Sequence, residues 1–302
     1  MSDASVPLEP PVPPRRRTNF RTVALVFLVL LALGFSLAIV VYKKYVAYEP
    51  SVSKHVPAGA DFVVRFDLTH VMLYEPFRRA VFPLVERGAP PAKPRKDRLA
   101  EQGLVIGADV RELLVAIGPA ATDWVIGVGG RLPKSGAAKA IAVVLREEGR
   151  SVEERGDGYT LPPSTLCFTQ ASDGTLLFAS NETRLAAAIA GGAAPPELNM
   201  GAGGLVYQPP GIIPGLRNVR AHWRAGSVVA VDARLELDLA GPPATALVEA
   251  LLRGISGVDP LLDGPVRTVQ VSSEGNVTSL HLQFPREAVE RLVALSVDRF
   301  PF

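Results

Sequence analysis

The sequence predicts an α+β protein with an N-terminal transmembrane helix and a two-part body of mostly antiparallel sheets, with helices packed on one face. Three observations lead to this class. A long uncharged apolar run lies near the N-terminus, strand-type and helical segments follow without strict alternation, and a Gly- and Pro-rich stretch at residues 192–204 divides the body. Each half begins with strands and ends in a strand hairpin followed by a helix, so an internal duplication is an open alternative.

Residues 23–42 form the predicted transmembrane helix. The nineteen residues from Val23 to Val41 carry no charge, and 14 of them are Val, Leu, Ile or Phe. At about 1.5 Å per residue, a helix of this length crosses the hydrocarbon part of a bilayer. A cleaved signal peptide is the alternative, but its apolar region is about 7 to 15 residues long. We therefore expect an uncleaved anchor.

Flanking charges predict the orientation of this helix. Four arginines precede it and three lysines follow it: Arg15, Arg16, Arg17 and Arg21, against Lys43, Lys44 and Lys54. The four-to-three difference favours a cytoplasmic N-terminus. The expected arrangement is a Pro/Arg-rich cytoplasmic tail at residues 1–22, a single pass through the inner membrane, and a periplasmic body at residues 45–302. Because 25 of the 32 basic residues are Arg, the composition is typical of a high-G+C bacterium.

The composition excludes several classes of protein. The 302 residues are 48% apolar, so the chain is long enough for one large or two smaller packed domains and is not disordered as a whole. The 32 basic and 30 acidic residues nearly cancel, which argues against a nucleic-acid-binding protein. The single cysteine, Cys167, cannot form an internal disulfide or, by itself, a zinc site.

The body divides into a tether at residues 43–58, a first α+β unit at residues 59–191, the linker at 192–204 and a second α+β unit at 205–302. In the first unit we expect strands at 62–68, 123–132, 140–147, 165–170 and 175–179, and helices at 70–87, 109–117 and 182–190, the last capped by Asn181. In the second unit we expect strands at 205–208, 219–224, 227–239, 266–272 and 277–284, and helices at 242–253 and 286–300.

No residue is predicted to be catalytic, to bind a cofactor or to hold a metal, and no cofactor is expected. The Gly-rich stretch at residues 127–136 lacks the spacing of a phosphate loop and is expected to be a hairpin turn with no helix behind it. The four histidines, His55, His70, His222 and His281, lie far apart in the sequence and have no metal-binding spacing.

A resemblance rests on three stretches of the first unit: Val56 to Asp61 before a strand that ends at Asp67-Leu68, Gly107 to Val110, and Asp173 to Ser180. They resemble bacterial exported, single-anchor proteins of uncharacterised domain families. The resemblance covers residues 56–191, implies a membrane-tethered, duplicated α+β body, and carries no catalytic residue. The second half departs from the pattern.

The leading functional hypothesis is a membrane-anchored, non-enzymatic protein that acts by binding, as a subunit of a bacterial envelope assembly. Its expected partners are the lipid bilayer, through residues 23–42, and an envelope protein, with no nucleic acid. Small residues spaced four apart would also allow a homodimer, through Ala32, Gly34, Ser36 and Ala38. One alternative is a periplasmic carrier or sensor of a lipid or glycan. The other is a hydrolase, which would need a cleft that pairs Asp or Glu with His222 or His281.

Overall fold

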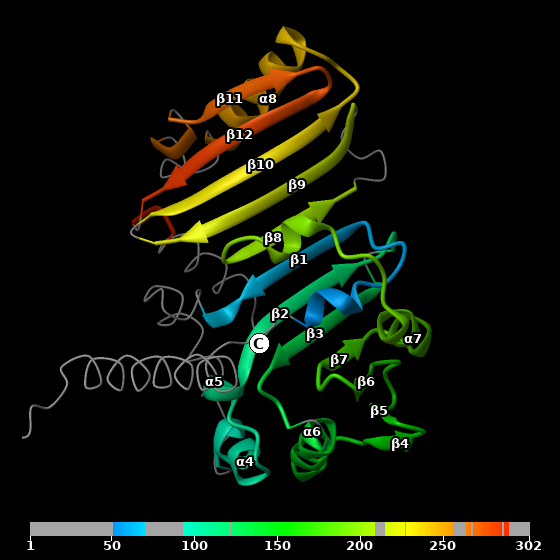
Figure 1. The fold of residues 1–302 in the computed structure, drawn as a ribbon. Coiled ribbons are helices and arrows are strands. Elements are labelled where there is room, and N and C mark those ends of the chain that lie inside the picture. The colour runs from blue at the N-terminus through cyan, green and yellow to red at the C-terminus, as the bar shows by residue number, and fades with distance from the viewer. Residues whose placement is uncertain are drawn as a thin grey trace, which may run out of the picture. The chain divides into compact units, whose positions relative to one another are not determined.

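The computed structural model describes residues 51–69, 93–120, 122–133, 135–208, 215–226, 228–256, 264–266, 268–285 and 287–289. The chain divides into two compact units, Met1–Glu49 and Pro50–Phe302, and every described residue belongs to the second. This part of the chain forms one sheet of 12 strands in the order β11-β12-β10-β9-β8-β1-β2-β3-β7-β6-β5-β4 (Figure 1). All of its neighbouring strands are antiparallel.

The elements up to residue 190 supply seven strands and most of the helices. In chain order they are η2 (Val52–His55), β1 (Phe62–Asp67), α4 (Arg95–Glu101), α5 (Ile106–Asp109), β2 (Val110–Ile117), β3 (Trp124–Gly130), α6 (Ala137–Glu147), β4 (Glu153–Arg155), β5 (Gly158–Thr160), β6 (Cys167–Gln170), β7 (Leu176–Ala179) and α7 (Glu182–Ala190).

The remaining elements extend the same sheet on the other side of β1. They are η3 (Pro196–Asn199), β8 (Gly203–Tyr207), β9 (Leu216–Ala225), β10 (Val229–Leu237), α8 (Pro242–Ser256), β11 (Gln270–Glu274) and β12 (Val277–Phe284). Strand β1 pairs with β2 on one side and with β8 on the other, so backbone hydrogen bonds join the two halves.

Helices cover both faces of the sheet. On one face, η2, α7 and Leu198 of η3 pack over Val63, Val125 and Leu177. On the other face, α6 packs over Phe168 and Leu176, and α8 covers the inner residues of β9, β10 and β12. In Figure 1, η2 and η3 lie in front of the sheet and α8 lies behind it.

This architecture corrects the predicted fold class. The body is one continuous 12-stranded sheet and not a two-part body with separate sheets, and its helices lie on two faces and not on one. The predicted linker at residues 192–204 contains η3 and the beginning of β8, which pairs with β1. The physical reason is visible in β7, where Leu176 packs toward α6 and Leu177 toward α7, so successive apolar residues are buried on opposite faces.

Two elements also differ in type from the prediction. Residues 109–117 were expected to form a helix, but Val110–Ile117 is strand β2, with burial alternating along its length between β1 and β3. Residues 140–147 were expected to form a strand, but they lie in α6, whose buried positions include Ala138, Ala142 and Val144. The helix at 182–190 is confirmed, and the Asn181 side chain accepts a hydrogen bond from the Arg184 backbone N–H at 2.9 Å, as a helix cap does.

We correct three predictions made from the sequence: a transmembrane helix, a single-pass signal anchor and an inner-membrane location. Within the ranges given above, no helix has the length and apolar character needed to cross a bilayer. The predicted span at 23–42, the tail at 1–22 and the proposed dimer residues Ala32, Gly34, Ser36 and Ala38 lie outside the described residues, as do His70 and most of the helices expected at 70–87 and 286–300.

Residues 51–58 were expected to form part of a tether, but they are built into the fold. Val52 is fully buried, and His55 is 7% exposed, with its ring nitrogens 3.0 Å from the Ala188 carbonyl and 3.1 Å from the Asp173 carboxylate. The Ser51 backbone N–H donates to Glu112 at 2.9 Å. This segment is therefore packed into the folded body of the protein.

Candidate functional site

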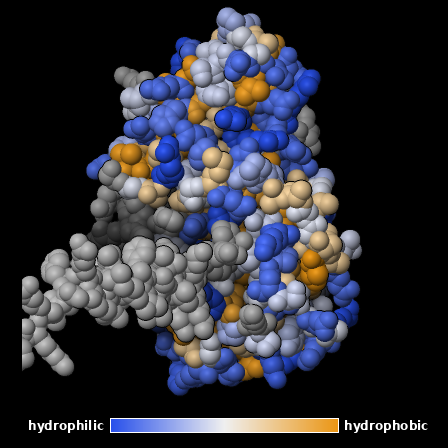
Figure 2. Space-filling model, viewed as in Figure 1, coloured by the Kyte–Doolittle hydropathy of each residue, from blue (hydrophilic) through white to orange (hydrophobic). Residues whose placement is uncertain are grey.

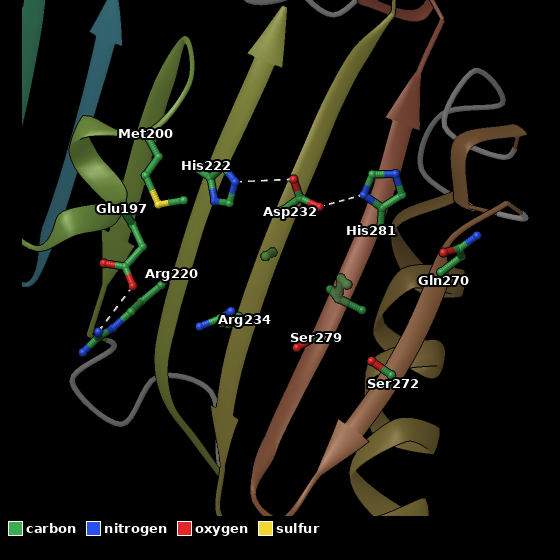
Figure 3. A pocket seen from close by; sticks show the side chains of 12 residues that line it. Glu197, Met200, Arg220, His222, Asp232, Arg234, Gln270, Ser272, Ser279 and His281 are labelled. Carbon is green, nitrogen blue, oxygen red and sulfur yellow. Dashed lines mark hydrogen bonds and ion pairs between the residues drawn. The ribbon is translucent and has the colours of Figure 1, made fainter.

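A polar trough crosses strands β9, β10, β12 and β11 on the face opposite α8 (Figure 3). It consists of two adjoining hollows, of about 360 Å³ and about 260 Å³, that share Glu197, Arg220 and Arg234. Figure 2 shows mainly hydrophilic residues over this end of the sheet. The first hollow is lined by Glu197, Met200, Arg220, His222, Asp232, Ala233, Arg234, Gln270, Ser272, Ser279, Leu280 and His281, and the second by Glu197, Asn218, Arg220, Arg234, Glu236 and Val277.

Strand register places these side chains together. On β10, Val231, Ala233 and Leu235 pack toward α8, so the alternating Asp232 and Arg234 point into the trough. Asp232 lies directly opposite His222 on β9 and directly opposite His281 on β12. The result is a row in which one carboxylate separates two imidazoles.

Asp232 contacts both histidines. Its Oδ1 lies 2.7 Å from His281 Nδ1, and its Oδ2 lies 3.4 Å from His222 Nε2 and 3.2 Å from Arg224 Nη2. The hydrogen bond from His281 lowers the pKa of Asp232, and the nearby charges of His222 and Arg224 add to the effect. Asp232 is therefore an ionised carboxylate at neutral pH.

The His281 ring takes part in two side-chain hydrogen bonds. The carboxylate can only accept, so His281 Nδ1 donates to it, and the Gln283 amide nitrogen can only donate, so His281 Nε2 accepts from it at 3.1 Å. Both nitrogens of His281 are occupied. In the described part of the chain no Ser, Thr or Cys side chain hydrogen-bonds to His222 or His281.

A second row contains two arginines. Arg220 on β9 lies directly opposite Arg234 on β10, and Ser279 on β12 continues the row. Arg220 Nη1 lies 3.4 Å from Glu197 Oε1, whereas Arg234 has no hydrogen-bond or ion-pair partner among the residues that the structure describes (Figure 3). This row presents positive charge and hydroxyl groups to the trough.

Glu197 owes its position to close contact between η3 and the sheet. A Cβ at residue 204 would collide with the Glu197 carbonyl and with Leu198 Cα, so the glycine at this position allows η3 to lie directly on β8. The Leu198 carbonyl accepts a hydrogen bond from Arg65 Nη1 at 3.1 Å. Arg65 is in turn paired with Glu112, with its Nε 2.8 Å from Oε2, and the two residues are 2% and 0% exposed. A buried ion pair thus fixes the segment that carries Glu197.

The Gly-rich stretch at 127–136 is not a hairpin turn between two strands, as was expected. Gly127, Gly129 and Gly130 belong to β3, and Gly136 precedes helix α6. A side chain of the protein already binds the N-terminus of this helix, because the Ala137 backbone N–H donates to Gln170 Oε1 at 3.1 Å.

A further hollow of about 440 Å³ lies beside Cys167, between β5, β6 and α7. Burial raises the pKa of the Cys167 thiol to about 11, and the charge of Glu182 acts in the same direction. A thiol with this pKa is not a nucleophile at neutral pH. In the described ranges no cluster of three or more His, Cys, Asp or Glu side chains could hold a metal ion.

The sequence alone did not bring the trough together. His222 and His281 were recognised as candidate bases, but their shared acid, Asp232, and the lining residues Glu197 and Arg234 were missed. The available signal was the alternation of charged and apolar residues along 219–224 and 229–237, which places Arg220, His222, Asp232 and Arg234 on one face once the hairpin register is known.

Comparison with known proteins shows similarity in fold only. No family model matches the chain, and no significant match is found among curated proteins. Two crystal forms of a protein named TP0453 share the fold. Form III has a TM-score of 0.54 and 12% sequence identity, and the match covers 83% of this chain and 99% of that chain. Form IV has a TM-score of 0.51 and 11% sequence identity, and the match covers 82% of this chain and 97% of that chain. These values establish a common architecture.

Proposed function

We propose that this chain is a non-enzymatic binding protein of the bacterial envelope and that the polar trough is its binding surface. The observation that carries the proposal is the chemistry of the trough. Charged and hydroxyl side chains from four strands and η3 line it, whereas both imidazole nitrogens of His281 are engaged by Asp232 and Gln283. The fold shared with TP0453 is compatible with this role.

The carrier alternative is supported less well. A carrier that holds a lipid between the two halves needs an apolar pocket lined from both. Instead, β1 pairs with β8 through a regular register, and Val63, Leu198 and Val206 fill the core at this junction. A glycan remains compatible, because the trough is polar.

Site-specific photocrosslinking in intact cells of the source bacterium tests the proposal. A photoreactive amino acid is placed at Ser272, an exposed residue of the trough, and at Ser151, an exposed residue outside it, as the matched control. We expect a discrete light-dependent adduct from position 272 alone. No adduct at 272, or the same adducts from both positions, would contradict the assignment of the trough as the binding surface.

The contacts of Asp232 with His222 and His281 favour a hydrolase as the second candidate. Under the binding proposal, the full chain hydrolyses ester, glycoside and peptide substrates no faster than buffer does. Turnover that is present in the unmodified chain and abolished by His222→Gln or by His281→Gln would establish the hydrolase instead.

A further inference from the structure

The two arginines of the trough form a like-charged pair with an incomplete set of partners. Arg220 and Arg234 are direct cross-strand neighbours, an arrangement in which like charges are destabilising. Glu197 Oε1 approaches Arg220 at 3.4 Å, and Arg234 has no partner in the described ranges. An anionic group placed between the two guanidinium groups would relieve their repulsion and could accept hydrogen bonds from both.

Two acceptor atoms beside this pair also lack partners. Glu197 Oε2 and Asn218 Oδ1 are buried, and neither has a hydrogen-bond partner among the residues that the structure describes. Asn218 is 8% exposed, and both side chains line the smaller hollow. A buried acceptor without a partner costs free energy, so a donor that reaches these oxygens after a small side-chain rotation is favoured.

The two observations together specify the ligand chemistry. The Arg220–Arg234 pair requires an anion, and the Glu197 and Asn218 oxygens require hydrogen-bond donors close to that anion. A simple anion supplies no donors. An acidic peptide in an extended conformation normally also uses apolar pockets for alternate side chains, and apolar groups are few in this lining, with Met200 and Val277 among them. A sugar that carries a carboxylate and several hydroxyl groups satisfies both requirements.

We propose that the trough binds an acidic saccharide, with a carboxylate held between Arg220 and Arg234 and hydroxyl groups that donate to Glu197 Oε2 and Asn218 Oδ1. Ser279 and Ser272 extend the same face and offer further hydroxyl contacts along the chain of sugars. This inference rests on the proposed binding function and specifies the class of ligand.

Calorimetric titration of the full chain tests the inference with three probes: trigalacturonate, the neutral trisaccharide maltotriose, and an acidic peptide of the same net charge as trigalacturonate. We expect trigalacturonate to bind at least about tenfold more tightly than maltotriose, because charge-assisted hydrogen bonds contribute more than neutral ones. Arg234→Gln should weaken trigalacturonate binding at least about tenfold. Arg131→Gln, at another exposed arginine without an ion-pair partner in the described residues, is the control and should leave the affinity unchanged.

Glu197→Gln separates a saccharide from a simple anion. If hydroxyl groups of the sugar donate to Glu197, this variant weakens trigalacturonate binding, whereas the binding of glutarate, which has no hydroxyl groups, strengthens because a negative charge is removed. A circular dichroism spectrum identical to that of the unmodified chain shows that each variant is folded.

Three results would overturn the acidic-saccharide assignment: no binding of trigalacturonate at millimolar concentration, equal affinity for maltotriose, or an affinity that Arg234→Gln does not change. Tighter binding of the acidic peptide, lost in Arg234→Gln, would overturn it while leaving the trough as the binding surface. The photocrosslinking experiment tests the proposed binding function separately, because that function fails if position 272 gives no specific adduct.

Discussion

The buried ion pair between Arg65 and Glu112 should be the most sensitive electrostatic contact in the sheet. Glu112→Gln keeps the shape of the side chain but leaves the Arg65 guanidinium, 2% exposed, without its carboxylate. Removal of one partner of a buried pair costs about 3–5 kcal/mol, because the remaining charge is uncompensated. With a urea m-value of about 1–3 kcal/mol per M, the unfolding midpoint should fall by about 1 M or more.

Urea titration at pH 7, followed by far-UV circular dichroism, measures this loss. Asp238→Asn, which breaks the exposed pair with Arg217, is the control and should cost less than about 1 kcal/mol. The double variant Arg65→Met/Glu112→Leu should be more stable than Glu112→Gln alone, because it removes both charges together. If Glu112→Gln lowers the free energy of unfolding by no more than Asp238→Asn does, the Arg65 charge left behind in the variant is not destabilising, and the reasoning is refuted.

Three further predictions concern single residues. Cys167, with a pKa of about 11 and 1% exposure, should react with a disulfide reagent at pH 8 at least about a hundredfold more slowly in the folded than in the urea-unfolded chain; comparable rates would contradict its burial. Gly204→Ala should lower stability by about 1–3 kcal/mol in urea titration and weaken ligand binding in the trough, because the added methyl displaces η3 and with it Glu197; an unchanged affinity would show that η3 does not position the site. The hydrogen bond from His281 lowers the pKa of Asp232 below its unfolded value, so its contribution is present above about pH 4 and lost as the pH falls through the folded pKa; the stability difference between the unmodified chain and Asp232→Asn should therefore shrink as the pH falls from about 5 to about 3, and a difference that grows over this range would reverse the sign of the shift.

The sequence correctly predicted those helices and strands whose signals lie within the segment itself, in capping residues or in the alternation of apolar and polar residues. Helix α7 has a capping asparagine before it and a glycine after it, and β12 alternates apolar and polar residues over its whole length. The prediction failed where packing decides between two allowed states. In Val110–Ile117 the residues Glu112, Leu113, Leu114 and Ala116 favour a helix, yet the segment pairs with β1 and β3 and becomes a central strand.

The fold class was wrong for a related reason. The Gly- and Pro-rich composition of residues 192–204 is typical of a linker between domains, and it was interpreted as one. In the structure, Gly204 permits η3 to pack against β8, and Leu198 is fully buried in the core beside Val63 and Val206. Glycines that allow close approach of backbone segments and glycines that confer flexibility look the same in a single sequence.

The candidate site depends on strand register, which explains why single residues gave no sign of it. His222 and Asp232 meet only because the hairpin between β9 and β10 pairs residue 222 with residue 232, and His281 joins them only through the pairing of β12 with β10. A shift of one residue in β10 would turn Asp232 and Arg234 toward α8 and place Val231 and Ala233 in the trough. The apolar face that packs against α8 forbids such a shift, because it would bury a carboxylate and a guanidinium among Val248, Leu252 and Leu280. The hydrophobic contacts of α8 on one face of the sheet therefore fix the arrangement of charges on the other.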